Sequence, residues 1–397
     1  METSASYVSE PQQKALEGAS TEFRTSGMTF VARFQQPRRL NLFSAYVIAA
    51  TLIWILLSCR SWNSVSQTRF EQTPTVHLVL TTTSSNKHTW TNNLTLKNYK
   101  VIPYIVDNKT ALYHTPANEG NEAMGYLAYL YEFYDHLPDI SIFLHGQDLA
   151  WHGDGALNYS TATTLNLLDL DEVKRRKFMN LRTNWQNGCP NWINTSITVN
   201  SSSYEPETKP EEAYMREAFE ALFPGDDVPE ILAAPCCSQL AVTRDTIRGV
   251  PREVFRNAME WLQNGRFHSS ISGRIWEHLW QWMFLKKAVD CPDESVALCS
   301  GYHVCFEKKE WEDWKVLEKM RLELLEELKE PLEPPEESDT GNVQGEIAEA
   351  EWRIKASERT AELALRIKTL EKTIEPWRQK AIWRGESEKR RREIIGG

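Results

Sequence analysis

The sequence predicts an α/β domain that lies between an N-terminal transmembrane helix and a C-terminal helical extension. Segments typical of strands and helices alternate between residues 76 and 144, which favours a sheet covered by helices. An uncharged apolar run near the N-terminus is long enough to cross a bilayer. A charged segment with helical periodicity follows Cys305, the last cysteine.

The elements of the domain follow from local composition. Residues 76–82 and 101–106 are enriched in β-branched side chains, which predicts strands. Residues 121–134 have a helical pattern, and residues 140–144 form a short apolar run typical of a buried strand. A short strand is expected within residues 233–242. Further helices are expected at residues 171–182, 211–222, 252–263 and 273–287.

Residues 42–59 are uncharged and mostly apolar, and about 18 to 20 such residues span a bilayer as a helix. The alternative is a buried core helix. Arginines before this run outnumber those after it, so the N-terminal segment should stay cytoplasmic. We expect a single-pass type II membrane protein of the Golgi or endoplasmic reticulum lumen or the cell surface. Its parts are a disordered cytoplasmic tail (1–39), a transmembrane helix (40–59), a stem (60–73), the α/β domain (74–306) and a charged helical tail (307–397).

Two further features agree with a lumenal domain. Six cysteines follow the apolar run, and an even number in an oxidising compartment indicates disulfides. The adjacent Cys236 and Cys237 are expected to bond to different partners. The other feature is a set of Asn-x-Ser/Thr sequons, which are glycosylated only in a lumenal chain. They begin at Asn93, Asn108, Asn158, Asn194 and Asn200.

The charged tail contains two segments with helical spacing of apolar residues, 310–329 and 346–374, separated by a proline-rich break. They predict a helical hairpin or a coiled-coil element for self-association. A solvated tail is the alternative, because the apolar stripe is thin. The formal net charge of −10 argues against a nucleic-acid partner, which normally requires a basic face.

The strand at 140–144 leads directly into polar residues, and ligand sites in α/β proteins lie at the carboxyl ends of strands. His145 and His152 are candidates for acid–base chemistry. Asp148 is a further catalytic candidate, and with Asp154 it is also a candidate ligand for Mn²⁺ or Mg²⁺. Trp151 is a candidate for stacking on a sugar. The alternative for this group is a hydrogen-bonded loop that only holds a turn.

Other candidates lie elsewhere in the domain. Glu122 begins a helix, where it could act in catalysis or simply favour the helix terminus. Glu277 is a candidate base. Asp169 and Asp171 form an Asp-x-Asp pair that either binds a metal or caps the following helix. The candidates for substrate binding are Asn118, Asn121, Trp151, Arg244, Asp245 and Arg274.

Several stretches in a specific order carry a resemblance to a known family. They include residues 118–152, LRTNWQNGCPNW (181–192), APCCSQLAVTRD (234–245) and SGRIWEHLWQWMF (272–284). On these stretches the chain resembles the fungal family of unknown function numbered 3431.

A weaker resemblance is to GT-A-type glycosyltransferases, on the Asn/Glu opening of the helix, the strand ending on His145 and the later Thr-Arg-Asp. It implies one mixed-sheet, Rossmann-like domain that transfers sugar from a nucleotide sugar. The site would then comprise Glu122, His145, Asp148, His152 and Glu277. The alternatives are a non-catalytic carbohydrate-binding or scaffold protein, or a metal-dependent hydrolase on His145, Asp148, His152 and Asp154.

Overall fold

The computed structural model describes residues 51, 54, 73–330, 332–333 and 343–396. The described residues from 73 onward belong to one compact unit. The predicted transmembrane helix and stem fall outside the described residues, apart from Thr51, Trp54 and Thr73. Among the helices that are described, none is both long and apolar enough to cross a membrane.

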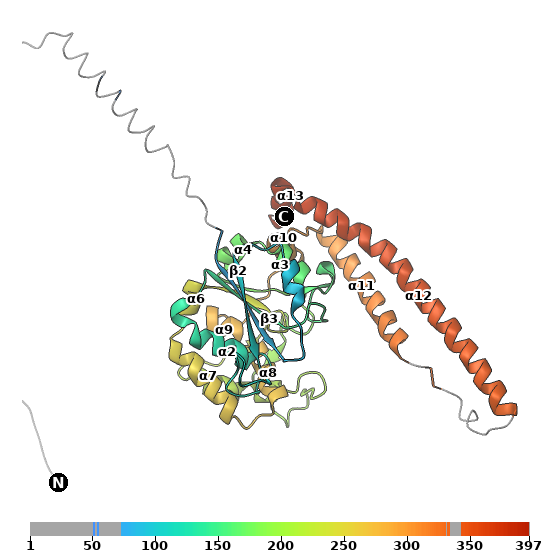
Figure 1. Ribbon diagram of the computed structural model, residues 1–397, viewed down its shortest axis with the longest axis horizontal. Helices are drawn as coiled ribbons and strands as arrows, with labels where there is room; N and C mark the ends of the chain where they lie inside the picture. Colours follow the sequence, from blue (N-terminus) through green and yellow to red (C-terminus); the bar gives the residue numbers. More distant parts are fainter. Residues whose placement is uncertain (1–50, 52–53, 55–72, 331, 334–342, 397) are drawn as a thin grey trace, which may run out of the picture. The chain divides into compact units, whose positions relative to one another are not determined.

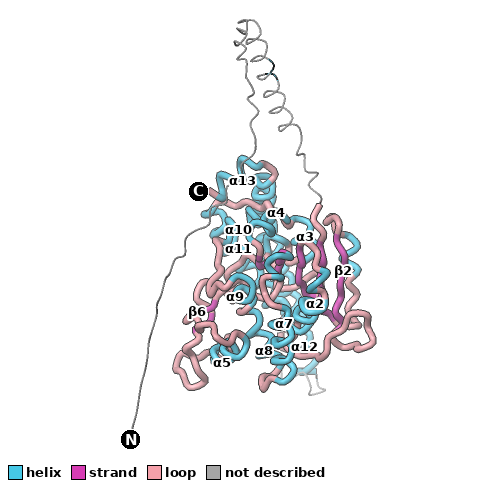
Figure 2. The backbone as a smooth tube through the Cα atoms, turned by 90° about the vertical axis from the view of Figure 1, so that its left-hand side faces the viewer, coloured by secondary structure: helices cyan, strands magenta, loops and turns pink. Residues whose placement is uncertain are grey.

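A five-stranded mixed sheet forms the centre of the domain, in the order β2-β1-β3-β7-β4, with β2 at one edge (Figure 2). The neighbouring strands β2, β1 and β3 run parallel, whereas β7 is antiparallel to both β3 and β4. The α/β class predicted from the sequence is therefore correct. The strands are β1 (Val76–Thr82), β2 (Tyr99–Ile105), β3 (Ile140–His145), β4 (Phe178–Asn180) and β7 (Leu240–Thr243).

Alternate residues of each strand pack into two hydrophobic cores, one on either face of the sheet. Val79 and Phe143 belong to the first core, whereas Leu78 and Leu144 belong to the second, as the two-residue period of a strand requires. Helices α2 (Ala123–Glu132), α7 (Arg252–Asn264), α8 (Ser269–Glu277) and α9 (Trp280–Leu285) contribute to the first core. Helices α3 (Thr161–Leu167), α4 (Leu170–Arg176) and α10 (Glu294–Tyr302) contribute to the second.

Shorter elements complete the domain, and one of them corrects a prediction. The helix expected at 171–182 ends at Arg176, because Lys177 adopts φ 69° and the chain then enters strand β4. The remaining elements are η1 (Thr89–Asn93), η2 (Tyr134–His136), η3 (Gly155–Leu157), β5 (Ile193–Asn194), η4 (Glu212–Tyr214), α5 (Met215–Leu222), β6 (Ile231–Leu232) and α6 (Arg244–Arg248).

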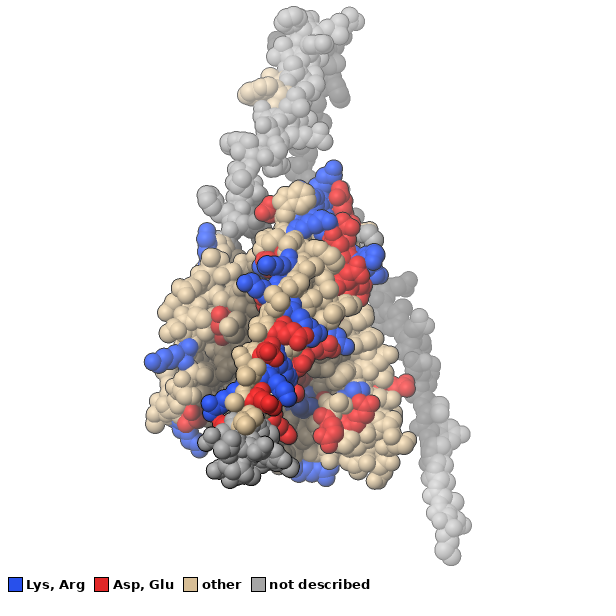
Figure 3. All heavy atoms as spheres, turned by 90° about the vertical axis from the view of Figure 1, so that its right-hand side faces the viewer, with Lys and Arg blue, Asp and Glu red and all other residues tan. Residues whose placement is uncertain are grey.

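Helices α11 (Lys308–Lys329) and α12 (Val343–Gly385) form an antiparallel hairpin, followed by α13 (Glu388–Ile395) (Figure 1). Leu324 of α11 packs with Leu363 and Ile367 of α12. Trp311 and Trp314 at the base of the hairpin are buried in the second core, so this part of the tail packs against the domain. The outward face carries charges of both signs (Figure 3). Coiled-coil self-association stays a prediction.

Three disulfides join the six described cysteines: Cys189–Cys291, Cys236–Cys237 and Cys299–Cys305. The prediction that Cys236 and Cys237 bond to different partners is wrong. The other four cysteines pair among themselves, which leaves these two neighbours to bond to each other.

Candidate functional site

The candidate site lies at the sheet edge where the parallel strands have their carboxyl ends. β3 ends there at His145, and β4 ends there at Asn180. Because β7 is antiparallel to both, it begins at this edge, so the preceding disulfide loop (residues 234–239) arrives beside His145. A single edge of the sheet thus gathers residues from distant parts of the chain.

Cys237 connects the end of β3 to the end of α8. His145 Nε2 donates to the backbone oxygen of Cys237 at 3.0 Å, which places the proton of a neutral His145 on Nε2, because a carbonyl only accepts. The backbone N–H of Cys237 lies close enough to the Glu277 carboxylate to favour its ionised form. Trp280 Nε1 donates to Ser238 Oγ at 3.2 Å and fixes the next residue of the loop. Loop, strand and helix are therefore held in one arrangement.

Glu277 has the electrostatic character of an acid–base group. Burial, followed by the negative charges of Glu122 and Glu211, raises the pKa of Glu277 to about 8, although Arg274 opposes this. The residue is partly exposed, and its carboxyl group exchanges its proton near neutral pH. This combination is typical of functional groups.

Glu122 lies beside Glu277 at the start of α2 and is buried, with 9% exposure. It makes no side-chain capping hydrogen bond to the described residues, so helix capping does not explain its position. One turn later, burial and the charges of Glu122 and Glu277 raise the pKa of Tyr126. The Tyr126 hydroxyl is buried and has no hydrogen-bond partner in the described structure.

Glu211 and His278 are buried close to Glu277. His278 Nε2 lies 3.2 Å from Glu211 Oε1, and both residues are buried. Arg274 Nη1 lies 3.6 Å from Glu211 Oε2. Arg274 is half exposed and lies close enough to favour the ionised form of Glu277. Of the two arginines that were predicted to bind substrate, Arg244 and Arg274, it is Arg274 that lies near Glu277.

The ring of His152 contacts the rings of both His145 and Trp151. Its ring centroid lies 4.4 Å from that of His145 and 4.1 Å from that of Trp151. Burial, then His145 and Arg182, lower the pKa of His152 to about 4, so it is neutral at pH 7. Trp151 is 63% exposed and presents its ring to solvent.

Asp148 and Asp154 use their carboxylate oxygens within the fold. Asp148 Oδ1 accepts from Ser160 Oγ at 2.9 Å and from Ala162 N at 2.8 Å. Asp154 accepts from Thr183 N at 2.8 Å, Thr183 Oγ1 at 3.0 Å and Asn184 N at 3.1 Å. These contacts are those expected of a hydrogen-bonded loop. A role of Asp148 and Asp154 as cation ligands stays a prediction. Across residues 73–330, 332–333 and 343–396, no cluster of three or more His, Cys, Asp or Glu is arranged to hold a metal.

Arg182 was not predicted from the sequence. It follows β4 and is 5% exposed, and its Nη1 donates to the sulfurs of Cys236 at 2.8 Å and Cys237 at 3.1 Å. Its Nε is buried without a partner among the described residues. Arg182 was missed because residues 171–182 were expected to form a helix. A strand at 178–180 instead carries the chain to this edge of the sheet.

Comparison with known proteins gives a family but no activity. Residues 78–300, more than half of the chain, match the family described as "Protein of unknown function (DUF3431)". The chain belongs to the DUF3431 family. No curated protein and no solved structure matches it. The matched region includes Glu122, His145, Cys237 and Glu277, and it ends before the hairpin.

Two more predicted residues lie at the amino end of α2 in this DUF3431 protein. Asn118 and Asn121 are exposed, and Asn121 adopts φ 52°. The side chain of Asn121 fills the space beside Gly273, where a Cβ would lie 2.4 Å from Nδ2. Asn121 therefore helps to pack α8, which carries Glu277, against the start of α2.

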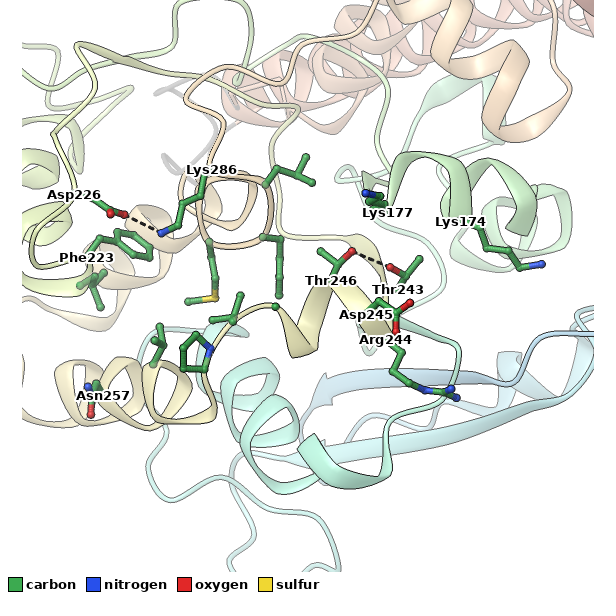
Figure 4. Close-up of a pocket in the computed structure, with 18 of the residues that line it drawn as sticks. Lys174, Lys177, Phe223, Asp226, Thr243, Arg244, Asp245, Thr246, Asn257 and Lys286 are labelled. Atoms are coloured by element: carbon green, nitrogen blue, oxygen red, sulfur yellow. Dashed lines mark hydrogen bonds and ion pairs between the residues drawn. The ribbon is translucent and has the colours of Figure 1, made fainter. Parts of the chain in front are cut away.

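The structure separates Arg244 and Asp245 from the site on the DUF3431 sheet. Arg244 Nη2 pairs with Asp139 Oδ1 at 2.9 Å, and Arg244 Nε donates to Leu137 O at 3.0 Å. Asp139 immediately precedes β3, so Arg244 lies at the edge opposite His145, because β7 runs antiparallel. Both Arg244 and Asp245 line a separate cavity of about 1150 Å³ (Figure 4).

Proposed function

We propose that this DUF3431 protein transfers a sugar from a nucleotide sugar to an acceptor hydroxyl, with Glu277 as the general base. The observation that carries the proposal is Glu277 itself, a partly exposed carboxyl group with a pKa of about 8 at the carboxyl edge of a mixed sheet. A carboxylate with a raised pKa is a stronger base, and about a tenth of it is ionised at pH 7.

In the proposed step, the Glu277 carboxylate takes the proton of the acceptor hydroxyl. The acceptor oxygen forms a bond to the anomeric carbon of the donor sugar. The bond from that carbon to the diphosphate oxygen breaks, and the nucleoside diphosphate leaves with the electron pair. Arg274 lies near enough to Glu277 to offset negative charge that develops on the leaving group.

Buried polar atoms without partners support a polar ligand at this edge. Within the described residues, Thr82 Oγ1, Tyr126 OH, His152 Nδ1 and Arg182 Nε are buried and make no hydrogen bond. They come from β1, α2 and the segments that follow β3 and β4. Because buried polar groups are normally paired, such a concentration near one edge indicates a bound ligand or water.

The proposal is tested by nucleotide-sugar turnover. The full chain, purified in detergent, is assayed for nucleoside diphosphate release from UDP- and GDP-sugars, with and without Mn²⁺. Glu277→Gln should lower the rate by about 100-fold or more, the usual contribution of a general base. Glu253→Gln is the control, because Glu253 is 59% exposed on α7 and pairs with Arg256 on the same helix. Absence of donor binding in calorimetry, or equal rates for both variants, contradicts the proposal.

We also propose a lumenal location and a single-pass type II topology for this chain. The support comes from the apolar run at 42–59, the five sequons and the three disulfides of the domain. Disulfides form and persist in oxidising compartments. Nucleotide-sugar transfer in a membrane-anchored lumenal domain agrees with such a location.

A further inference from the structure

A second large cleft adjoins the candidate site and has a volume of about 980 Å³. One wall comes from the segments after β3 and β4, including Trp151, Arg182 and Trp185. The other wall is the exposed side of α11, from Trp311 to Glu326. Trp151 and Arg182 belong to both the cleft and the group around His145, so the cleft adjoins the candidate site.

The cleft has an aromatic lining with one open ring. Trp311 and Trp314 stack with centroids 5.3 Å apart and are buried in the wall. Trp185 is partly exposed, and its Nε1 donates to Pro292 O at 2.7 Å, which fixes the ring. Trp151 stands at the rim, 63% exposed and backed by His152. An indole held from behind offers a flat apolar face with little loss of side-chain freedom on binding.

Polar groups are interleaved with these rings. Glu294 accepts from Trp185 N at 2.7 Å and from Trp311 Nε1 at 3.0 Å. Trp314 Nε1 and Arg182 Nε are buried donors on residues that line the cleft, and neither has a partner among the described residues. Two unpaired donors in one lining indicate a ligand that brings hydrogen-bond acceptors.

We propose that this cleft binds a neutral oligosaccharide, which serves as the acceptor in the proposed sugar transfer. A sugar ring has an apolar face for Trp151 and hydroxyl oxygens for the unpaired donors. Acidic and basic side chains both line the cleft, including Glu318, Glu323, Lys315 and Lys319, so no single charge selects an ionic ligand. The role as acceptor rests on the proposed function, whereas oligosaccharide binding does not.

The test is a calorimetric titration of the full chain in detergent with four neutral hexasaccharides: maltohexaose, cellohexaose, mannohexaose and chitohexaose. At least one should bind, and Trp151→Ala should weaken that binding by 10-fold or more. Trp383→Ala is the matched control, because Trp383 is 54% exposed on α12 and packs on Arg390, away from the cleft lining. Leu322→Arg is a second variant that narrows the cleft from α11, where Leu322 is 39% exposed.

The outcomes separate this inference from the proposed enzymatic activity. Binding that survives in Glu277→Gln while transfer is lost supports both. Oligosaccharide binding without any sugar transfer supports the binding site and overturns the proposed enzymatic activity. Failure of all four hexasaccharides to bind at millimolar concentration overturns the inference, as does an equal effect of Trp151→Ala and Trp383→Ala. If the cleft binds only an apolar dye, it is a hydrophobic docking surface, and that result also overturns the inference.

Discussion

Glu277 and His145 both lie beside the backbone of one residue, Cys237. The carbonyl oxygen of Cys237 accepts from His145 Nε2 at 3.0 Å, and its N–H lies close enough to the Glu277 carboxylate to favour the ionised form. These residues come from α8 and from the end of β3, more than a hundred positions apart in the sequence. The disulfide loop therefore brings α8 and the end of β3 to one place.

The raised pKa of Glu277 should affect how the free energy of unfolding depends on pH. A glutamate ionises near pH 4.3 in an unfolded chain but at about pH 8 in this fold. Between these values the folded state binds more protons than the unfolded state, so the free energy of unfolding falls as pH rises. Glu277→Gln should remove this fall, measured by urea denaturation at pH 5, 6, 7 and 8. An unchanged slope in the variant, or the same change in Glu253→Gln, contradicts the assignment.

Arg182 and Asp154 should be energetically coupled, because both side chains are buried and the charge of each favours the ionised form of the other. Arg182→Met leaves the Asp154 carboxylate without its cation and should lower the free energy of unfolding by about 3 kcal/mol. The double variant with Asp154→Asn should lose less than the sum of the single variants. Arg256→Met, at a half-exposed surface pair, should cost less than about 1 kcal/mol. Additive single effects would show that the two groups do not interact.

The base of the hairpin should come apart in acid. Arg384 donates to Glu307 and Glu310 and is 6% exposed. Its hydrogen bonds to Glu310 are the main reason that the pKa of Glu310 falls to about 2. Because this pKa is lowered, the stabilisation is present above about pH 4.3 and is lost as pH falls through about 2.

Hydrogen exchange of α12 between pH 5 and 2 measures this effect. Wild-type protection should fall across the range, whereas Arg384→Met should be weakly protected throughout. Arg366→Met is the control, since Arg366 is 54% exposed and pairs within α12. Identical hydrogen exchange in the wild type and Arg384→Met would show that the contact between Arg384 and Glu310 does not stabilise the hairpin.

Sequon exposure gives a prediction for glycosylation. Asn93, Asn158 and Asn200 are exposed and should carry glycans. Asn108 and Asn194 are half-buried, and their side chains accept from Thr110 N and Ser196 N, so they should be modified less. Mass spectrometry before and after endoglycosidase treatment measures each site. Unmodified protein, or a C-terminal tag digested by protease in intact microsomes, contradicts the lumenal topology.

Local patterns were sufficient to predict much of the architecture. The β-branched runs at 76–82 and 101–106 predicted β1 and most of β2, and the apolar run at 140–144 predicted β3. The periodic leucines after Cys305 predicted the hairpin helices. These predictions succeeded because hydrophobic periodicity depends only on neighbours in the sequence. His145 could be placed at the end of a strand for the same reason.

Tertiary structure decided which residues share an edge of the sheet. The antiparallel direction of β7 carries Arg244 to the edge opposite His145 and brings Cys237 beside it. Strand β4, which was predicted to be a helix, places Arg182 against the disulfide. Strand direction and pairing depend on contacts between segments far apart in the chain, which no local pattern records. By itself, therefore, the sequence determined the α/β class and the individual candidates, and folding alone decided which of them meet.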